Sequence, residues 1–140
     1  MLFELIPVTD GEFTVLAGAV LFFALCIGHA VADFPLQGSF LATAKDRHQH
    51  PPGIDPGLPE RCRIWIYAMS AHCLVHAGFV WVITGNWKLG LAEFIAHWII
   101  DFLKCERVTN FDVDQALHLL TKLAFVILAL LGVVTIGAAA

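Results

Sequence analysis

Histidine and carboxylate residues recur four positions apart in the apolar parts of this chain. The segment EFIAHWIIDFLK, residues 93 to 104, places Glu93, His97 and Asp101 at this interval. Residues four apart share one face of an α-helix, so the segment would carry a polar stripe on an otherwise apolar surface. Such a stripe is costly in contact with lipid. We therefore expect it to face the interior of a helix bundle, where ionisable residues usually have a functional role.

Three further segments carry matching pairs, which are His29 and Asp33 in HAVAD, His72 and His76 in HCLVH, and Asp114 and His118 in DQALH. Zinc, iron and manganese accept imidazole and carboxylate ligands, and carboxylates also orient metal-bound histidines. The core of a helix bundle is a usual place for such a site. We therefore predict that one or two divalent transition metal ions bind there, with ligands drawn from His29, Asp33, His72, His76, His97, Asp101 and His118.

The same set of residues would support hydrolysis. A bound metal ion lowers the pKa of its water, which makes hydroxide available near neutral pH. A carboxylate, Glu93 or Asp114, would act as general base. We predict that an anionic group of the substrate is bound by four further side chains, Gln37, Lys45, Lys104 and Gln115. The leading prediction is a metal-dependent membrane hydrolase acting on a lipid-linked or amphiphilic substrate, which could contain phosphate, at the cytoplasmic interface.

Three other functions remain open at this point. The same ligands would serve a metal-ion binding or transport protein without catalysis. Histidines from facing helices are also typical axial ligands of a haem-binding electron carrier, although a carboxylate beside each histidine argues against haem. Finally, the polar residues of a structural membrane subunit would only hold its helices together. The sequence leaves the metal, the substrate and the oligomeric state open, including a homo-oligomer, and we expect no nucleic-acid partner.

Composition indicates an all-α integral membrane protein. The 140 residues are 59% hydrophobic and 14% charged, and the mean hydropathy is +0.77, whereas about a quarter of an average soluble domain is charged. Four segments could cross roughly 30 Å of hydrocarbon at about 1.5 Å per residue. We predict a single domain over residues 1–140, an antiparallel four-helix transmembrane bundle with spans at about 12–34, 64–84, 88–104 and 113–136.

The loops predict the orientation in the membrane. The long first loop, residues 35–63, contains Lys45, Arg47, Arg61 and Arg63, and the third loop contains Lys104 and Arg107. Because lysine and arginine are enriched in cytoplasmic loops, we expect both loops inside the cell and both termini outside, in the inner membrane. Within the first loop we expect a short helix around residues 39–47, and then an irregular segment because of Pro51, Pro52, Pro56 and Pro59.

This orientation aligns the polar residues in depth. Counted from the cytoplasmic helix ends, four histidines, one from each span, lie at a similar level of roughly 7 to 14 Å, and they are His29, His72, His97 and His118. We expect Asp33, Asp101 and Asp114 nearer the cytoplasm and His76 and Glu93 nearer the midplane. Lys122, one turn past His118, must extend to the interface or pair with a carboxylate.

The motifs HAVADFPLQ, HCLVH, EFIAHWIIDFLK and FDVDQALH, together with Lys45, resemble in order and spacing a family of small bacterial and phage membrane proteins, catalogued as domain of unknown function 3307. The resemblance covers about residues 26 to 120 and implies a multi-span inner-membrane protein, with no established reaction. At the level of pattern alone, the chain is also similar to membrane-bound metal-dependent hydrolases. The proline-rich first loop departs from the family pattern.

Overall fold

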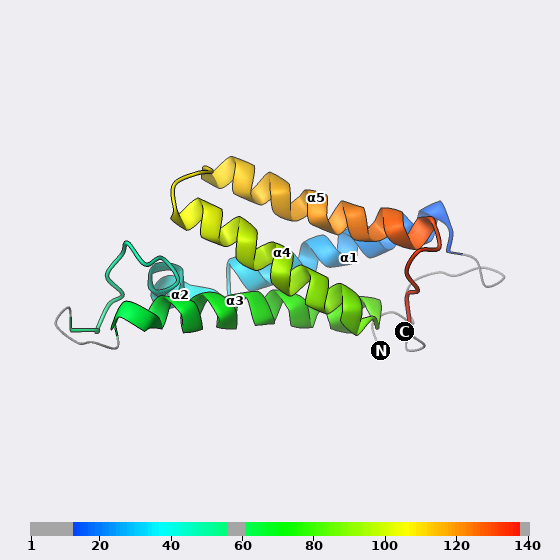
Figure 1. The fold of residues 1–140 in the computed structure, drawn as a ribbon. Coiled ribbons are helices and arrows are strands. Elements are labelled where there is room, and N and C mark those ends of the chain that lie inside the picture. Colours follow the sequence, from blue (N-terminus) through cyan, green and yellow to red (C-terminus); the bar gives the residue numbers. More distant parts are fainter. Residues whose placement is uncertain (1–12, 56–60, 138–140) are drawn as a thin grey trace.

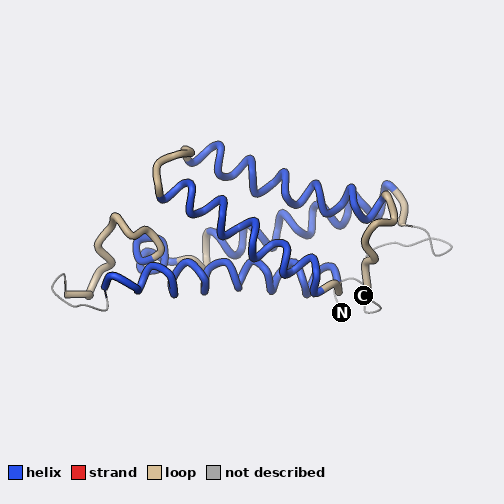
Figure 2. The backbone as a smooth tube through the Cα atoms, in the orientation of Figure 1, coloured by secondary structure: helices blue, strands red, loops and turns tan. Residues whose placement is uncertain are grey.

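The computed structural model describes residues 13–55 and 61–137, and all the regular structure within them is helical (Figures 1 and 2). The five helices are α1 (Val15–Asp33), α2 (Gly38–Ala44), α3 (Arg61–Thr84), α4 (Trp87–Cys105) and α5 (Phe111–Leu130). The predicted all-α class is therefore confirmed. The short helix expected in the first loop is present as α2, while Pro56 and Pro59 lie outside the described residues.

The four long helices form a ring around a common interior (Figure 1). Helix α3 packs against α1 and α4, and α5 packs against the same two helices, so each long helix has two long neighbours. The short helix α2 contacts α3. Only residues 85–86 separate α3 from α4, and such a short connection makes the two helices antiparallel neighbours.

Local capping sets the helix ends. Side chains of Thr14, Asn86 and Asn110 accept backbone hydrogen bonds at the starts of α1, α4 and α5, which satisfies donors that lack a partner within the helix. The predicted end of the last span at residue 136 is too late. Helix α5 ends at Leu130 because Gly132 has a φ of 68° and Val133 donates to the Leu128 carbonyl oxygen at 2.9 Å, a typical glycine-containing terminus.

Three described helices are long and apolar enough to cross a membrane, and they are α1, residues Arg63–Thr84 of α3, and α5. This agrees with a membrane protein. The predicted start of the first span, Glu12, lies outside the described residues. Helix α4 has 19 residues but carries the most polar stripe, and it is not among the three.

Two apolar clusters lie within the bundle. One contains buried residues of all four long helices, namely Ala17, Leu21, Leu25, Val80, Ile83, Leu89, Phe125 and Val126. The other contains Met69, Cys73 and Cys105, with Phe94, Trp98 and Phe102 packed against them. The free cysteines Cys73 and Cys105 thus act here as small apolar residues. The buried polar residues of the same four helices form the candidate site.

Candidate metal centre

Five histidines gather in the interior of the bundle. They come from all four long helices, are at most 5% exposed, and are His29, His72, His76, His97 and His118. The ring of His97 is central, with its centroid 3.7 Å from that of His76, 4.0 Å from His118 and 5.0 Å from His72. The polar faces predicted from the interval of four residues within each helix therefore do face one another. His76, which we expected in a separate layer nearer the midplane, stacks directly on His97.

Four of the predicted ligands have the spacing that a single metal ion requires. Asp33, His72, His76 and His97 each offer one atom, and these atoms all lie within 4.8 Å of one another. Nε2 of His72 is 3.2 Å from Nε2 of His97 and 3.4 Å from Oδ1 of Asp33. Nε2 of His76 is 3.2 Å from the same Asp33 oxygen. Bonds of about 2.0–2.1 Å to a tetrahedral ion place neighbouring ligand atoms roughly 3.3–3.4 Å apart, so these separations fit a first coordination shell.

Hydrogen bonding alone does not satisfy this group. Nε2 of His76 is buried, and although Oδ1 of Asp33 lies 3.2 Å away, the angles are unsuitable and the atom makes no hydrogen bond within the described part of the chain. Nε2 of His72 faces the His97 nitrogen and a carboxylate oxygen of Asp101 at 3.3 Å, besides Asp33, and one N–H cannot donate to all three. Because a buried polar atom without a partner is costly, the arrangement favours a cation among these atoms.

Glu93 orients the central histidine. Nδ1 of His97 donates to Oε1 of Glu93 at 3.1 Å, which leaves Nε2 directed at His72. Carboxylates fix metal-binding histidines in this way. The same Glu93 oxygen accepts a hydrogen bond from Lys122, and both side chains are about 1% exposed. Of the two alternatives stated for Lys122, the structure shows pairing with a carboxylate. Lys122 was not among the predicted site residues. The feature that could have identified it is the presence of a lysine within an apolar span.

Two more lysines neutralise the remaining buried acids. Nζ of Lys45 donates to Oδ2 of Asp101 at 2.6 Å, and Nζ of Lys104 donates to Oδ2 of Asp114 at 3.0 Å. Asp101 and Asp114 also form a group with His118 that could hold an ion. Their pairing with lysines makes a second dication there less favourable. Asp33 has no lysine partner in the described residues, so the group around Asp33 is the better metal candidate.

The remaining predicted substrate-binding residues join the same network. Gln37 accepts a hydrogen bond from Lys45 at 2.9 Å. The amide of Gln115 donates to Oδ2 of Asp33 at 2.9 Å and to Oδ2 of Asp114 at 3.3 Å. The side chains of Asp33 and Lys104 are 11% and 30% exposed, unlike the histidines. The site therefore opens to its surroundings beside these two residues.

The first loop is fastened to the end of α4 beside the site. Asp46 accepts a hydrogen bond from Arg107 at 2.8 Å, and Glu106 accepts one from Arg47 at 2.7 Å. Arg47 also lies over the ring of Phe102, 5.5 Å from its centroid. The first contact joins residues that are 61 positions apart in the chain, and the second joins residues that are 59 positions apart. Neither contact could be predicted from the sequence because of these long separations. They hold α2, and with it Lys45, against the bundle.

Electrostatics also support this fastening. Burial raises the pKa of Asp46, but hydrogen bonds from the Gln49 side chain, the His48 backbone and the Arg107 guanidinium outweigh that effect. The pKa of Asp46 consequently lies below its usual value, and the side chain stays ionised when the loop is in place.

Fold and site together define an all-helical protein with membrane-spanning character and a buried cluster of histidines, carboxylates and lysines. The chain belongs to the family described as "Protein of unknown function (DUF3307)", whose model matches residues 21–138. That match covers every predicted site residue from His29 to His118, and it confirms the resemblance seen in the motifs. No curated protein and no solved structure matches the chain.

Proposed function

We propose that this protein is a metal-dependent membrane hydrolase with one divalent ion, zinc, iron or manganese, held by Asp33, His72, His76 and His97. The observation that carries the proposal is the clustering of these four ligand atoms within 4.8 Å, with a buried Nε2 of His76 that has no hydrogen-bond partner among the described residues. Three imidazoles and one carboxylate suit all three metals.

A single ion fits the charges better than two. Of the four acids in the cluster, all but Asp33 already carry a lysine, in the pairs Lys45–Asp101, Lys104–Asp114 and Lys122–Glu93. A dication next to Asp33 would meet one uncompensated carboxylate and three neutral imidazoles. A second dication at Asp101, Asp114 and His118 would have to displace a lysine from its buried partner, which is strongly unfavourable. The remaining group, His29, His97 and His118, has no carboxylate to offset a second dication and shares His97 with the Asp33 group.

We further propose that α4 is the fourth transmembrane helix. It lies between α3 and α5, its polar residues Glu93, His97 and Asp101 are buried, and Leu91, Ile95 and Ile99 are exposed. The stripe that lowers the hydropathy of α4 therefore does not face lipid. With α4 crossing the membrane, the positive-inside rule places α2 and the α4–α5 turn on the cytoplasmic side of the inner membrane.

The residues around the ion have separable roles in hydrolysis. When bound, the ion would supply an activated water near neutral pH. Glu93 and Asp114 each have one buried carboxylate oxygen, Oε2 and Oδ1, without a hydrogen-bond partner in the described residues. Asp114 is the better candidate for general base, because its partner Lys104 is 30% exposed at the opening of the site. Glu93 is instead a positioning residue, because its Oε1 holds His97 and the buried Lys122. Water would be excluded from the rest of the site by its burial.

The substrate would enter where the site is exposed, beside Asp33 and Lys104. Lys104 at this opening is suited to bind an anionic group such as a phosphate. Lys45 is buried further inside and donates to Asp101, while the half-buried Gln37 accepts a hydrogen bond from Lys45. The opening adjoins the cytoplasmic helix ends, so a lipid-linked or amphiphilic molecule would present its polar part there while its apolar part remains in the bilayer.

One observation favours the second candidate, metal binding or transport without catalysis. Four protein ligands complete the shell of a tetrahedral ion, whereas catalytic zinc sites usually keep one position open for water. Hydrolysis therefore requires either a five- or six-coordinate ion or exchange of the partly exposed Asp33.

The two candidates are separated by assaying metal-loaded protein against phospho- and acyl-lipids. We expect hydrolysis by the wild type, loss of activity with full metal content in Asp114→Asn, and no change in Asp112→Asn, the matched exposed acid on the same helix. Metal bound at full occupancy with no hydrolysis of any lipid would reject the hydrolase. Metal flux into proteoliposomes would then identify a transporter.

A further inference from the structure

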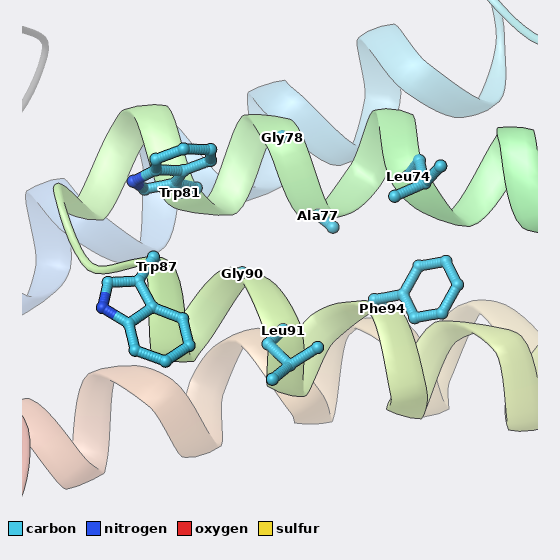
Figure 3. A pocket seen from close by; sticks show the side chains of 8 residues that line it. All are labelled: Leu74, Ala77, Gly78, Trp81, Trp87, Gly90, Leu91 and Phe94. Atoms are coloured by element: carbon cyan, nitrogen blue, oxygen red, sulfur yellow. The ribbon is translucent and has the colours of Figure 1, made fainter.

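An apolar groove runs along α3 and α4 (Figure 3), and no proposed metal ligand lines it. It has a volume of about 650 Å³ and is lined by Leu74, Ala77, Gly78, Trp81, Trp87, Gly90, Leu91 and Phe94. None of these side chains is charged. An occupant of the groove itself must therefore be apolar.

Two glycines make the groove. A Cβ atom at Gly90 would meet the Ala77 carbonyl oxygen and the Trp81 Cβ at 3.0 Å, so Gly90 allows α3 and α4 to approach closely. Gly78 is different, because a Cβ atom there would meet nothing within 4 Å. The missing side chain of Gly78 thus leaves open space above a tightly packed pair of helices.

One end of the groove has the character of a membrane interface. Trp81 and Trp87 flank that end (Figure 3), close to the α3–α4 turn, and tryptophan is enriched where lipid headgroups meet hydrocarbon. Nζ of Lys88 lies 6.0 Å from the centroid of the Trp87 ring. Lys88 is the only lysine or arginine between Arg63 and Lys104, and it has no ion-pair partner within the described ranges.

We propose that the groove binds one acyl chain of an anionic phospholipid whose headgroup phosphate contacts Lys88. The groove spans eight residues of α3, from Leu74 to Trp81, whose seven steps of about 1.5 Å make about 10 Å, a third of the hydrocarbon thickness. A chain lying there would extend from the headgroup level toward the middle of the bilayer. The apolar lining selects the chain, and the single cation beside Trp87 selects the charge of the headgroup.

Tryptophan quenching by brominated lipids tests the proposal. In the Trp65→Phe/Trp98→Phe protein, Trp81 and Trp87 are the only tryptophans, and excitation at 295 nm avoids Tyr67. The protein is reconstituted in phosphatidylcholine vesicles containing phosphatidylglycerol or phosphatidylcholine brominated on the acyl chains. We expect phosphatidylglycerol to quench at about a five-fold lower mole fraction, the preference that one lysine near an anionic headgroup provides. Lys88→Gln should remove this preference.

Filling the groove provides the second variant. Gly78→Leu should weaken quenching by both lipids, while Ala124→Leu, a matched change at an exposed position on α5, should leave it unchanged. Equal quenching by the two lipids in the parent protein would overturn the proposal. Protection of both tryptophans from either lipid would also overturn it, in favour of a second copy of the chain in the groove.

A measurement on the unaltered chain does not depend on the tryptophan variants. Lipids that co-purify with wild-type protein should be enriched in phosphatidylglycerol relative to the membrane, and this enrichment should be lost in Lys88→Gln. Identical lipid composition in the two preparations would contradict the role of Lys88.

Discussion

Neutralising Glu93 should have two effects that a second substitution separates. The Glu93 carboxylate accepts hydrogen bonds from both Lys122 and His97, and Glu93 and Lys122 are each about 1% exposed. Glu93→Gln leaves the ammonium group of Lys122 buried without a counter-charge. Breaking a buried ion pair in this way costs about 3–5 kcal/mol. It also replaces the carboxylate that orients His97 by an amide oxygen, a weaker and uncharged acceptor, which should weaken metal binding by about 10- to 100-fold.

The double variant Glu93→Gln/Lys122→Met should recover most of the stability but not the metal affinity. Both buried charges are then absent, and replacement of an ion pair by side chains of similar volume is often close to neutral. His97 still lacks its carboxylate partner, so metal binding stays weak.

Thermal unfolding of the metal-free proteins in detergent, followed by circular dichroism, gives the stabilities, and competition with a chelating dye gives the metal affinities. The single variant Lys122→Met is also measured, which completes a double-mutant cycle for Glu93 and Lys122. Strictly additive losses of stability would refute the pairing, and recovery of metal affinity in the double variant would refute the orienting role of Glu93.

Three other predictions concern separate parts of the molecule. His76→Ala should lower metal affinity by more than the roughly 10- to 100-fold cost of losing an orienting partner, with helix content unchanged because Nε2 has no hydrogen bond in the described residues; retained affinity in a dye competition would contradict this. Gly90→Ala should destabilise α3–α4 packing by about 1–3 kcal/mol in thermal unfolding, whereas Gly78→Ala, which meets nothing within 4 Å, should not; equal melting of the two would reject the close-approach argument. Since folding lowers the pKa of Asp46, its contribution is complete above the unfolded pKa of about 4 and is lost as pH falls through the folded value. Asp46→Asn should therefore flatten the stability profile below that pH, and parallel profiles would contradict this.

The sequence predicted the parts of the site that depend on local spacing. An interval of four residues places Glu93, His97 and Asp101 on one face of α4, and the structure shows all three buried. Antiparallel packing then brings this face against the histidines of α1, α3 and α5. Because the same interval operates within every helix, the cluster was foreseeable without knowledge of any contact.

Contacts between distant residues were not foreseeable in the same way. Lys45 and Asp101 are 56 positions apart, and their hydrogen bond depends on where α2 docks. The pairing of Lys122 with Glu93 depends on the relative rotation of α4 and α5, which spacing leaves undetermined. These pairs carry the proposal of one ion rather than two, a choice that residue spacing alone left open. The end of α5 was also mispredicted, since an apolar stretch continues past Gly132 while the left-handed conformation of Gly132 ends the helix.

The metal content of the purified protein tests the central claim most directly. Wild-type protein purified in detergent, incubated with zinc, iron(II) or manganese and freed of excess ion, should contain about one ion per chain, the number that a single four-residue shell holds. Asp112→Asn should contain the same amount, while His76→Ala and His97→Ala should lose it with their helix content intact. Wild-type protein that retains none of these metals, or histidine variants that retain the wild-type amount, would contradict the account.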